Sequence, residues 1–410
     1  MTSTISDSQP KMTHYRWLML ALCALTPLFV STLPTMSLPP MFTVISADLN
    51  LTLVEIGTVW GAQSLMGIFF SLLGGILGDR FGTRRTLVSV CLLTGIFGMM
   101  RGFATDFTTL LLATILMSAF QMIIPIVIFK VIRQWMPPER LGMASGITSA
   151  GFATGLMLGP LLSTSVIMPA LGGWRQVLIF YGIIAIAFSV IWFVATASEK
   201  KHQGDTHSQT TSLMNNLRHV ISLRNVWILG LAGLGIGACF RGFTGYMPTY
   251  LKDIGWPELA ADQALSAFFL ASLIGVVPLS TLSDRLQIRR GFLAVAALIL
   301  ATGIGSLAFV PDNLILIVIA ATGLVFDSFM AILNATVMEV DGVGHLYAGT
   351  ALGFANTIRS VGMSLSPPIG NSLAIYGLST PFLFWGGLGF LGVFIFIFVF
   401  KSPKRKRVTA

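Results

Sequence analysis

Long uncharged, apolar runs are the feature of this sequence that most constrains its fold. Charged residues make up only 10% of the 410 positions and gather between the runs. A run of about 20 apolar residues can cross the hydrocarbon core of a bilayer as a helix, which satisfies its own backbone hydrogen bonds. We therefore predict an all-α membrane protein with twelve transmembrane helices, at residues 15–40, 52–77, 87–104, 108–133, 142–169, 174–196, 225–251, 261–282, 291–310, 312–338, 349–376 and 379–401.

Prolines inside the runs predict where these helices bend or break, because proline lacks a backbone N–H and clashes with the preceding turn. They are Pro27, Pro34, Pro39 and Pro40 in the first run, Pro125 in the fourth and Pro160 in the fifth. The three cysteines, Cys23, Cys91 and Cys239, all lie in apolar runs, and we interpret them as small buried hydrophobic residues.

Lysine and arginine predict the orientation. With the N-terminus inside the cell, 20 of the 25 Lys and Arg residues fall in cytoplasmic segments and only Arg101, Arg175 and Lys252 fall in outer loops. Cytoplasmic loops of membrane proteins carry such an excess. We expect a multi-pass protein of the cell (inner) membrane with both termini in the cytoplasm. The net charge of +9 then reflects topology and lipid contact, and no nucleic-acid partner is expected.

One long polar stretch follows the sixth run and divides the chain. We expect a cytoplasmic tail at 1–14, an N-terminal six-helix bundle at 15–197, a cytoplasmic linker at 198–224, a C-terminal six-helix bundle at 225–401 and a basic tail at 402–410. The linker histidines, His202, His207 and His219, are interpreted as solvated residues and not as metal ligands. Neither a metal nor a cofactor is expected.

A compact charged motif lies between the second and third runs. It consists of Gly75, Asp79, Arg80, Gly82, Arg84 and Arg85. Charge is costly in hydrocarbon and glycine permits tight turns, so the motif predicts a short hairpin at the membrane surface. A weaker copy 205 residues later places Asp284, Arg285, Arg289 and Arg290 at the positions of Asp79, Arg80, Arg84 and Arg85. The repeat predicts two similar halves.

This motif resembles the loop 2–3 signature of the major facilitator superfamily, and the degenerate second copy is also typical of that family. The resemblance covers nearly the whole chain. It implies two pseudo-symmetric six-helix bundles with a solute site between them, and a secondary transporter that works by alternating access. It also implies that the motif, with Asp284 and Arg285, is a gate that locks the inner face in the outward-facing state. A topology anchor without a gating role is the alternative.

A second repeat of small residues and proline is offset by 207 positions. Its members are Gly146, Gly155, Gly159 and Pro160 in the fifth run and Gly353, Gly362 and Pro367 in the eleventh. Small residues let helices approach closely. The fifth-run copy resembles the antiporter signature of the family, but Ser163 and Thr164 occupy the positions of its two further glycines. A general packing motif is the alternative interpretation.

Three ionisable residues lie deep in the runs and are candidate site residues by default. They are Arg241, Asp327 and Arg359. Gln121 precedes Asp327 by 206 residues and is its repeat mate. The resemblance places spans 1, 4, 7 and 10 around a central cavity, so Arg241, Gln121 and Asp327 are the first candidates for solute binding. Arg359 and Asn356 on the eleventh span are second candidates, and Tyr246 either lines the cavity or packs in the core.

Two arginines and one acid leave one positive charge uncompensated inside the membrane, which favours an anionic solute, with Arg241 as its main contact. A structural Arg–Asp pair without a solute role is the alternative. We predict a monomeric secondary transporter of a small organic or inorganic anion, with a proton or another ion as the coupling partner. A proton-coupled multidrug or metabolite efflux antiporter and a transporter-like sensor are the rivals. No enzyme motif is present in the sequence.

Overall fold

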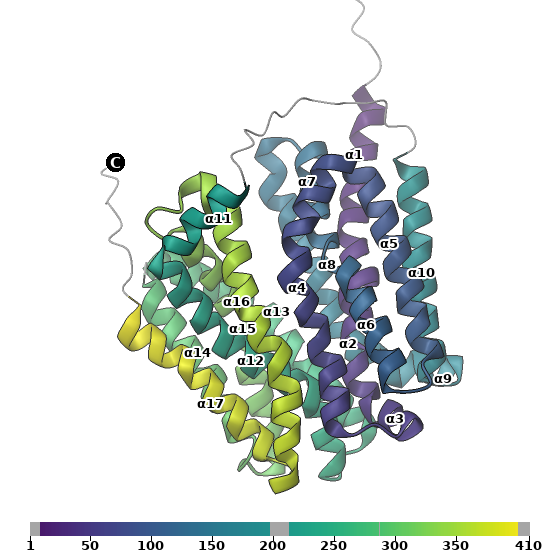
Figure 1. Cartoon of the computed structure of the whole chain (residues 1–410), viewed down its shortest axis with the longest axis vertical. Helices are drawn as coiled ribbons and strands as arrows, with labels where there is room; N and C mark the ends of the chain where they lie inside the picture. The colour runs from purple at the N-terminus through teal and green to yellow at the C-terminus, as the bar shows by residue number, and fades with distance from the viewer. Residues whose placement is uncertain (1–8, 197–212, 287, 401–410) are drawn as a thin grey trace, which may run out of the picture. The chain divides into compact units, whose positions relative to one another are not determined.

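The computed structural model describes residues 9–196, 213–286 and 288–400, and in these ranges the side chains of 9–14, 71–79, 213–214 and 345 lie outside the description. Nearly every described residue is helical, and the described ranges contain no strand. The all-α prediction is therefore confirmed. Figure 1 labels the α-helices along the chain.

The first sequence half forms ten α-helices. They are α1 (Gln9–Thr26), α2 (Leu33–Met36), α3 (Leu38–Leu49), α4 (Leu53–Phe81), α5 (Thr83–Met100), α6 (Phe107–Gln121), α7 (Ile124–Trp135), α8 (Leu141–Leu162), α9 (Met168–Leu171) and α10 (Trp174–Ala195). The second half forms α11 (Leu213–Ser222), α12 (Arg224–Asp253), α13 (Glu258–Leu286), α14 (Arg289–Ser306), α15 (Asp312–Met338), α16 (Gly344–Ser372) and α17 (Thr380–Phe394), and α17 continues as a π-helical turn, Ile395–Val399.

Eleven helical stretches of the described chain are long and apolar enough to cross a membrane. The remaining expected span, 349–376, corresponds to α16, which is 29 residues long but less apolar, since it carries Asn356, Arg359, Ser364, Pro367 and Asn371. All twelve expected spans are therefore helical, and one of them owes its lower hydropathy to polar groups that pack inside the protein.

The proline positions coincide with irregular helix geometry, as predicted. Pro27 begins a π-helical turn, Pro27–Thr32, between α1 and α2. Pro125 is the second residue of α7, just after the break that separates it from α6. A second π-helical turn, Ser163–Ile167, follows Pro160 at the end of α8. The first, fourth and fifth spans are thus segmented, whereas α12 runs unbroken for 30 residues.

Two of the expected polar segments contain helical residues. Helix α1 begins at Gln9, inside the stretch 1–14 expected to be a tail, while residues 1–8 lie outside the description. The stretch 198–224 contains the helix α11, in which Val220 is fully buried. His219 is half-buried and has protein partners: its Nε2 lies 2.9 Å from the Gly342 carbonyl oxygen, and its ring centroid lies 4.2 Å from that of Tyr347. His202 and His207 lie outside the described residues.

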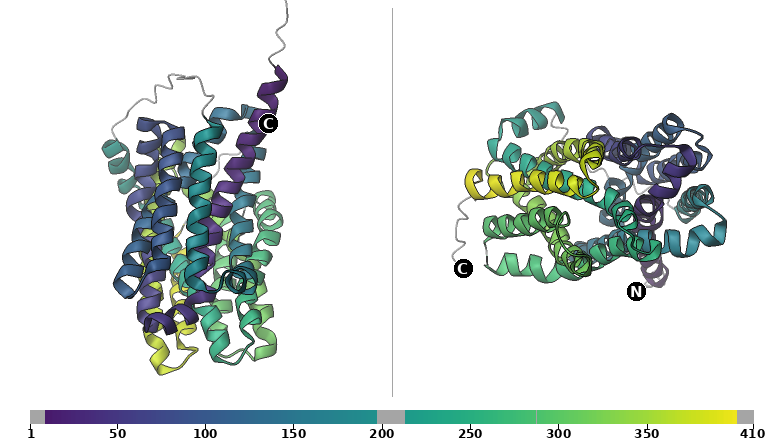
Figure 2. Two further views of the ribbon diagram at one scale, coloured as in Figure 1. Left: turned by 90° about the vertical axis from the view of Figure 1, so that its right-hand side faces the viewer. Right: turned by 90° about the horizontal axis from the view of Figure 1, so that it is seen from below.

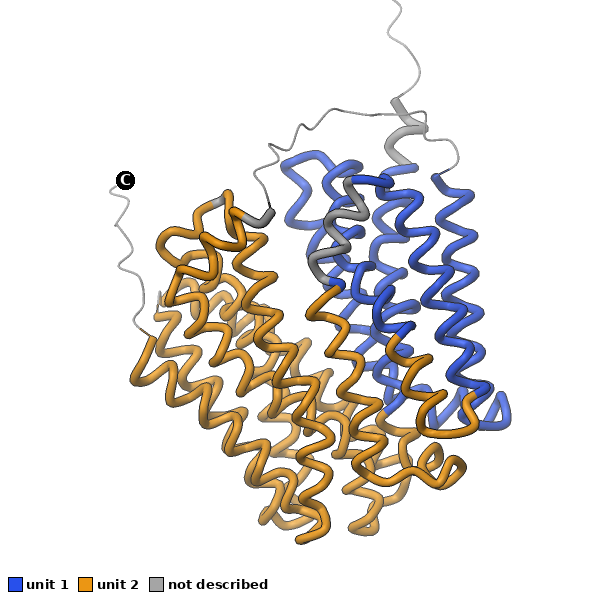
Figure 3. The backbone as a smooth tube through the Cα atoms, viewed as in Figure 1, with its two compact units in different colours: residues 1–38, 70–103, 116–199 blue, residues 39–69, 104–115, 200–410 orange. Residues whose placement is uncertain are grey.

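The chain forms two compact units that do not coincide with the sequence halves (Figure 3). Unit 1 comprises Met1–Leu38, Phe70–Phe103 and Leu116–Glu199. Unit 2 comprises Pro39–Phe69, Ala104–Ile115 and Lys200–Ala410. Two stretches of the first half therefore pack with the second half in unit 2. The division at the linker describes the sequence repeat and remains a prediction.

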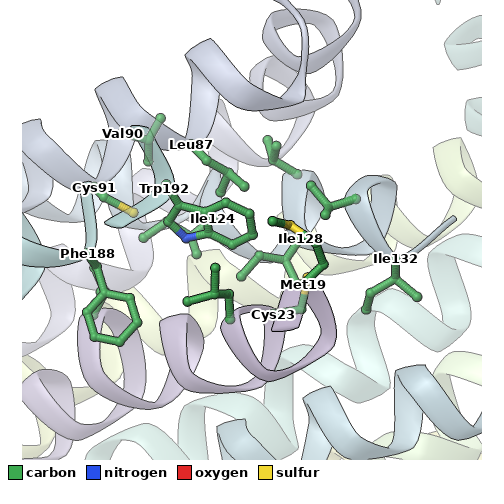
Figure 4. Close-up of a cluster of buried hydrophobic side chains, with 14 of the residues drawn as sticks. Met19, Cys23, Leu87, Val90, Cys91, Ile124, Ile128, Ile132, Phe188 and Trp192 are labelled. Carbon is green, nitrogen blue, oxygen red and sulfur yellow. The ribbon is translucent and has the colours of Figure 1, made fainter. Parts of the chain in front are cut away.

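The core of unit 1 is an aliphatic cluster around Trp192, to which α1, α5, α7 and α10 contribute (Figure 4). Cys23 and Cys91 are buried in it, as predicted. Trp192 donates from Nε1 to the hydroxyl of Thr26 over 2.9 Å, so the one polar atom of the indole is satisfied. Helices α5 and α10 run side by side (Figures 1 and 2), and a Cβ on Gly95 would meet the Gly182 carbonyl oxygen at 2.7 Å.

The core of unit 2 is aromatic. Phe240 on α12 stacks on Phe326 on α15 with ring centroids 3.9 Å apart. Trp385 on α17 is fully buried and donates to the Ser366 carbonyl oxygen over 3.1 Å. Its indole ring lies over Gly242 of α12, where any side chain would overlap it. Helix α12 is consequently surrounded by neighbours along most of its length, and this fixes the setting of Arg241.

Candidate functional site

Arg241 lies on α12 in unit 2 with 5% of its surface exposed. Its Nη2 donates to the Trp60 carbonyl oxygen over 2.8 Å and to Gln63 Oε1 over 2.9 Å. Its guanidinium carbon lies 3.3 Å from the centroid of the Trp60 ring. Cation–π contacts of this kind stabilise by about 2 kcal/mol when desolvated. The predicted main solute contact is thus bound to two residues of the second span.

Trp60 is fully buried. It also donates a hydrogen bond to Arg241, from its Nε1 to the Arg241 carbonyl oxygen over 2.8 Å. The indole lies over Gly245, where a Cβ would overlap the ring, and Phe42 packs edge-on against it at 5.8 Å between centroids. Glycine at 245 is therefore required by this close approach. The sequence alone did not identify Trp60 or Gln63; the one signal it carries is a glutamine near the middle of the second run.

Asp327 on α15 and Arg359 on α16 are both half-buried. Among the described residues, no ion pair within 4.0 Å joins Asp327 to Arg241 or to Arg359. The backbone N–H of Asp327 donates to Ser272 Oγ over 3.1 Å. The structural Arg–Asp pair considered as an alternative is therefore not formed in this structure.

The Arg359 side chain crosses between two helices. Its methylene stem packs on Gly233 and Gly237 of α12. Its Nη1 lies 3.2 Å from the sulfur of Met330, and a thioether is a weak acceptor. Asp327, Met330 and Asn334 are half-buried at spacings of three and four residues, which places them on one face of α15. Asn356, also half-buried, lies one turn before Arg359 on α16. The structure thus brings Arg359 to the face of α15 that carries Asp327.

Gln121 is buried in unit 1 and all its polar atoms are occupied. Its Nε2 donates to the carbonyl oxygens of Val30 and Ser31 over 3.2 and 3.0 Å, and its Oε1 accepts from Thr35 over 3.3 Å. These carbonyls belong to the π-helical turn of the first span. Gln121 therefore stabilises an irregular backbone, and the contacts leave it no N–H donor for a solute.

Tyr246 packs in the core of unit 2. Its ring centroid lies 5.7 Å from those of Phe382 and Trp385, and its hydroxyl donates to the Leu378 carbonyl oxygen over 3.0 Å. Of the two roles considered for it, the structure favours packing.

A buried ion pair lies in unit 2 where the sequence predicts an outer loop. Lys252, at the end of α12, lies 2.9 Å from Asp262 on α13 and donates to the Pro40 carbonyl oxygen over 2.8 Å. The sequence placed Lys252 in an outer loop from its position just after the seventh run, and in the structure it is the last residue but one of α12 and half-buried. Its two partners are an acid from the next span and a backbone oxygen of α3.

In the first charged motif, the side chains of Gly75 and Asp79 lie outside the described residues. Gly82 adopts φ +81°, in the left-handed region, and forms the predicted turn between α4 and α5. Arg84 donates to the Phe193 carbonyl oxygen of α10 over 3.1 Å. Arg80 and Arg85 are exposed.

In the second motif, Arg289 contacts Asp284 at 3.2 Å and Glu339 at 3.0 Å, and Arg285 is exposed.

Arg290 donates to the carbonyl oxygens of Phe396 and Ile397 at the end of the last span. This contact is equivalent to that of Arg84 with the end of the sixth span. Arg84 and Arg290 are also the second residues of α5 and α14. The repeat is therefore offset by 206 residues here, because two positions separate α13 from α14 and one separates α4 from α5.

The small-residue motif of the fifth span lies against the first span in unit 1. A Cβ on Gly155 would overlap Thr32, and one on Gly159 would meet Met36 Cβ at 2.8 Å. A Cβ on Gly146 would meet nothing within 4 Å, and close packing begins instead at Gly151.

In the eleventh span, a Cβ on Gly362 would meet the Leu234 carbonyl oxygen at 2.7 Å. Pro160 and Pro367 lie inside α8 and α16, and Gly353 accepts a hydrogen bond from Thr357 over 3.0 Å.

Repeated sets of long apolar helices with arginines inside them are typical of a multi-pass membrane protein. The chain belongs to the Major Facilitator Superfamily, whose family model matches residues 25–367 and 260–410. This confirms the resemblance carried by the charged motif.

Similar proteins agree with that assignment. The chain is 26% identical over 384 residues to a protein described as "Probable sulfoacetate transporter SauU" from Cupriavidus necator, covering 88% of this chain and 87% of that one. It is 25% identical over 274 residues to the "Probable nitrate/nitrite antiporter NarK1" of Thermus thermophilus, covering 63% and 60%. The crystal structure of a bacterial homologue of the human lysosomal transporter Spinster superposes with a TM-score of 0.73 at 15% identity, covering 95% of each chain, and shares the fold.

Proposed function

We propose that this protein carries a small carboxylate, sulfonate or inorganic anion across the cell membrane by alternating access. The observation that carries the proposal is Arg359, a guanidinium inside a membrane span whose hydrogen-bond partner among the described residues is a thioether sulfur. An arginine in such a position is costly unless an anion offsets its charge. Its planar fork suits the paired oxygens of carboxylate, sulfonate or nitrate. The relatives described as sulfoacetate and nitrate/nitrite carriers support the same class of solute.

In this proposal the solute binds between Arg359 and the half-buried face of α15, with Asn356 as a neutral donor one turn away. Asp327, on that face, carries the coupling proton, and its deprotonated form would repel an anion at Arg359. Arg241 remains the second candidate contact and becomes available only when it leaves Trp60. The charged motif around Asp79 gates the inner side, and the protein acts as a monomer with both termini in the cytoplasm.

The test measures binding and uptake with the purified protein in proteoliposomes. The solutes are sulfoacetate, cis,cis-muconate and nitrate, with galactose as the neutral control and ethidium as the cationic control. We expect saturable uptake of at least one anion and of neither control. Removing a hydrogen bond to a charged group costs about 2 kcal/mol, so Arg359→Gln should weaken binding of that anion about 30-fold. Arg359→Lys retains the charge but loses the fork and should have an intermediate effect.

Arg224→Gln is the matched control, because Arg224 is an exposed arginine at the start of α12. It should bind the anion as the unmodified protein does. The proposal is wrong if Arg359→Gln binds within twofold of the unmodified protein, or if only the neutral or cationic solutes are transported.

A further inference from the structure

We infer that Trp60 and Arg241 form a latch that closes the second span against the seventh and must open in each transport cycle, with Gln63 as its positioning residue. The inference needs only the transporter fold and does not depend on which solute is carried. It assigns Arg241 a role that its sequence position did not predict.

The latch is reciprocal. Each of the two residues donates a hydrogen bond to the backbone carbonyl oxygen of the other, both over 2.8 Å, and the guanidinium lies on the face of the indole. The residues are 181 positions apart and belong to different sequence halves, although both lie in unit 2. Gln63, one turn after Trp60, holds Nη2 of Arg241 from the side at 2.9 Å. The guanidinium is therefore held in place by two residues of one short stretch of α4.

The same stretch of α4 also packs closely against α16, the eleventh span. A Cβ on Gly61 would overlap the Ser364 carbonyl oxygen, and one on Gly57 would meet the Pro367 backbone at 3.1 Å. Asn371 donates to the Leu53 carbonyl oxygen over 2.7 Å. Small residues four positions apart permit this approach. The contacts around Trp60 thus belong to a continuous seam, formed by residues 53–63 of α4 with α12 and α16.

The seam is built to be reversible. It joins residues of the two sequence halves, which in a transporter of this fold must separate on one side of the membrane at a time. The described part of the seam contains no carboxylate within 4.0 Å of Arg241, so the charge is balanced only by the indole and by neutral oxygens. Nε of Arg241 and Nε2 of Gln63 are buried without a hydrogen-bond partner among the described residues. Unsatisfied buried donors offset part of the gain from closing the latch, so the closed state is not locked.

The experiment measures how often the seam opens, with no solute present. Cys23, Cys91 and Cys239 are replaced by alanine, and Ser364→Cys is added as a reporter, because Ser364 is buried at 9% exposure opposite Gly61. The rate at which a methanethiosulfonate reagent labels Cys at 364 is followed in detergent, where both sides of the protein are accessible. Trp60→Phe retains an aromatic ring but loses the N–H donor. Gly245→Ala adds a Cβ that overlaps the indole and removes no hydrogen bond.

We expect Trp60→Phe and Gly245→Ala each to raise the labelling rate at least fivefold. Trp192→Phe is the matched control: it makes the same change at another fully buried tryptophan, whose N–H donates to the hydroxyl of Thr26 and which belongs to unit 1, whereas the seam belongs to unit 2. It should leave the labelling rate within twofold. Size-exclusion elution and the melting temperature identify a variant that has unfolded, and Gly245→Ala carries the test if Trp60→Phe does so.

The inference is overturned if Trp60→Phe and Gly245→Ala label no faster than Trp192→Phe. It is also overturned if Arg241→Lys, which retains the charge but cannot reproduce the fork, leaves the labelling rate unchanged. Because labelling is measured without solute, these outcomes are separate from a failure of the anion assignment, which is judged by binding to Arg359 variants.

Discussion

Replacing Gln121 with leucine tests whether a side chain of the fourth span supports the broken backbone of the first. Pro34 has no N–H, so the carbonyl oxygen of Val30, four residues earlier, cannot accept a normal α-helical hydrogen bond from it. Gln121 supplies a donor to that oxygen and to the next one, at Ser31, and accepts from Thr35. Leucine has nearly the same size but neither donates nor accepts.

The expected loss of stability follows from these three contacts. Hydrogen bonds between membrane helices contribute about 0.6 kcal/mol each on average, so the three together contribute about 2 kcal/mol. At roughly 2 °C per kcal/mol for a unit of this size, the melting temperature should fall by about 4 °C. The three cysteines are buried, so a thiol-reactive fluorophore reports unfolding directly.

Gln263→Leu is the matched control, because Gln263 is an exposed glutamine on α13. It makes the same chemical change and should shift the melting temperature by less than about 1 °C. The reasoning is refuted if Gln121→Leu melts with or above the unmodified protein, since the gain in apolarity would then outweigh the hydrogen bonds to the π-helical turn.

Two further predictions concern helix packing and orientation. Gly275→Ala should lower the melting temperature by several degrees, because its Cβ would overlap the Leu324 carbonyl oxygen between α13 and α15. Overpacking of this kind costs about 2 kcal/mol. The control is Gly387→Ala, whose Cβ would meet nothing within 4 Å and which should be neutral or stabilising. Ser8→Cys and Ser402→Cys, each in a background without the three native cysteines, should resist a membrane-impermeant thiol reagent added outside intact cells, and labelling of either from outside would overturn the predicted cytoplasmic termini.

The sequence was informative wherever the physical cause is local. Apolar length predicted the spans, and Pro27, Pro125 and Pro160 marked where three of them are irregular, because the loss of an N–H acts on the residues beside it. The turn at Gly82 was predicted for the same reason. Helix α11 was missed, since a short amphipathic segment between polar stretches gains its stability from docking on residues 342–347 and not from its own composition.

The surroundings of the candidate residues were less predictable, because their partners lie far away in the sequence. Arg241 was identified as a buried charge, but its partners Trp60 and Gln63 lie 181 and 178 positions away. Lys252 was placed in a loop, and the acid that buries it belongs to the next span. The charged residues counted in the spans suggested an Arg–Asp pair. The sequence could not show whether the pair forms, because an indole face and backbone oxygens also accommodate a guanidinium.

The two halves use equivalent positions differently, and the reason lies in their backbones. In the first half, Pro34 interrupts the helix, and Gln121 is occupied in satisfying the carbonyls that the interruption exposes. The repeat mate of Pro34 is Arg241, where α12 continues without a break. Asp327, the mate of Gln121, therefore has no irregular backbone to stabilise, and its carboxylate stays on the half-buried face of α15 near Arg359. The two halves thus use equivalent positions for different purposes: Gln121 supports a kink in the first span, whereas Asp327 has no such kink to support.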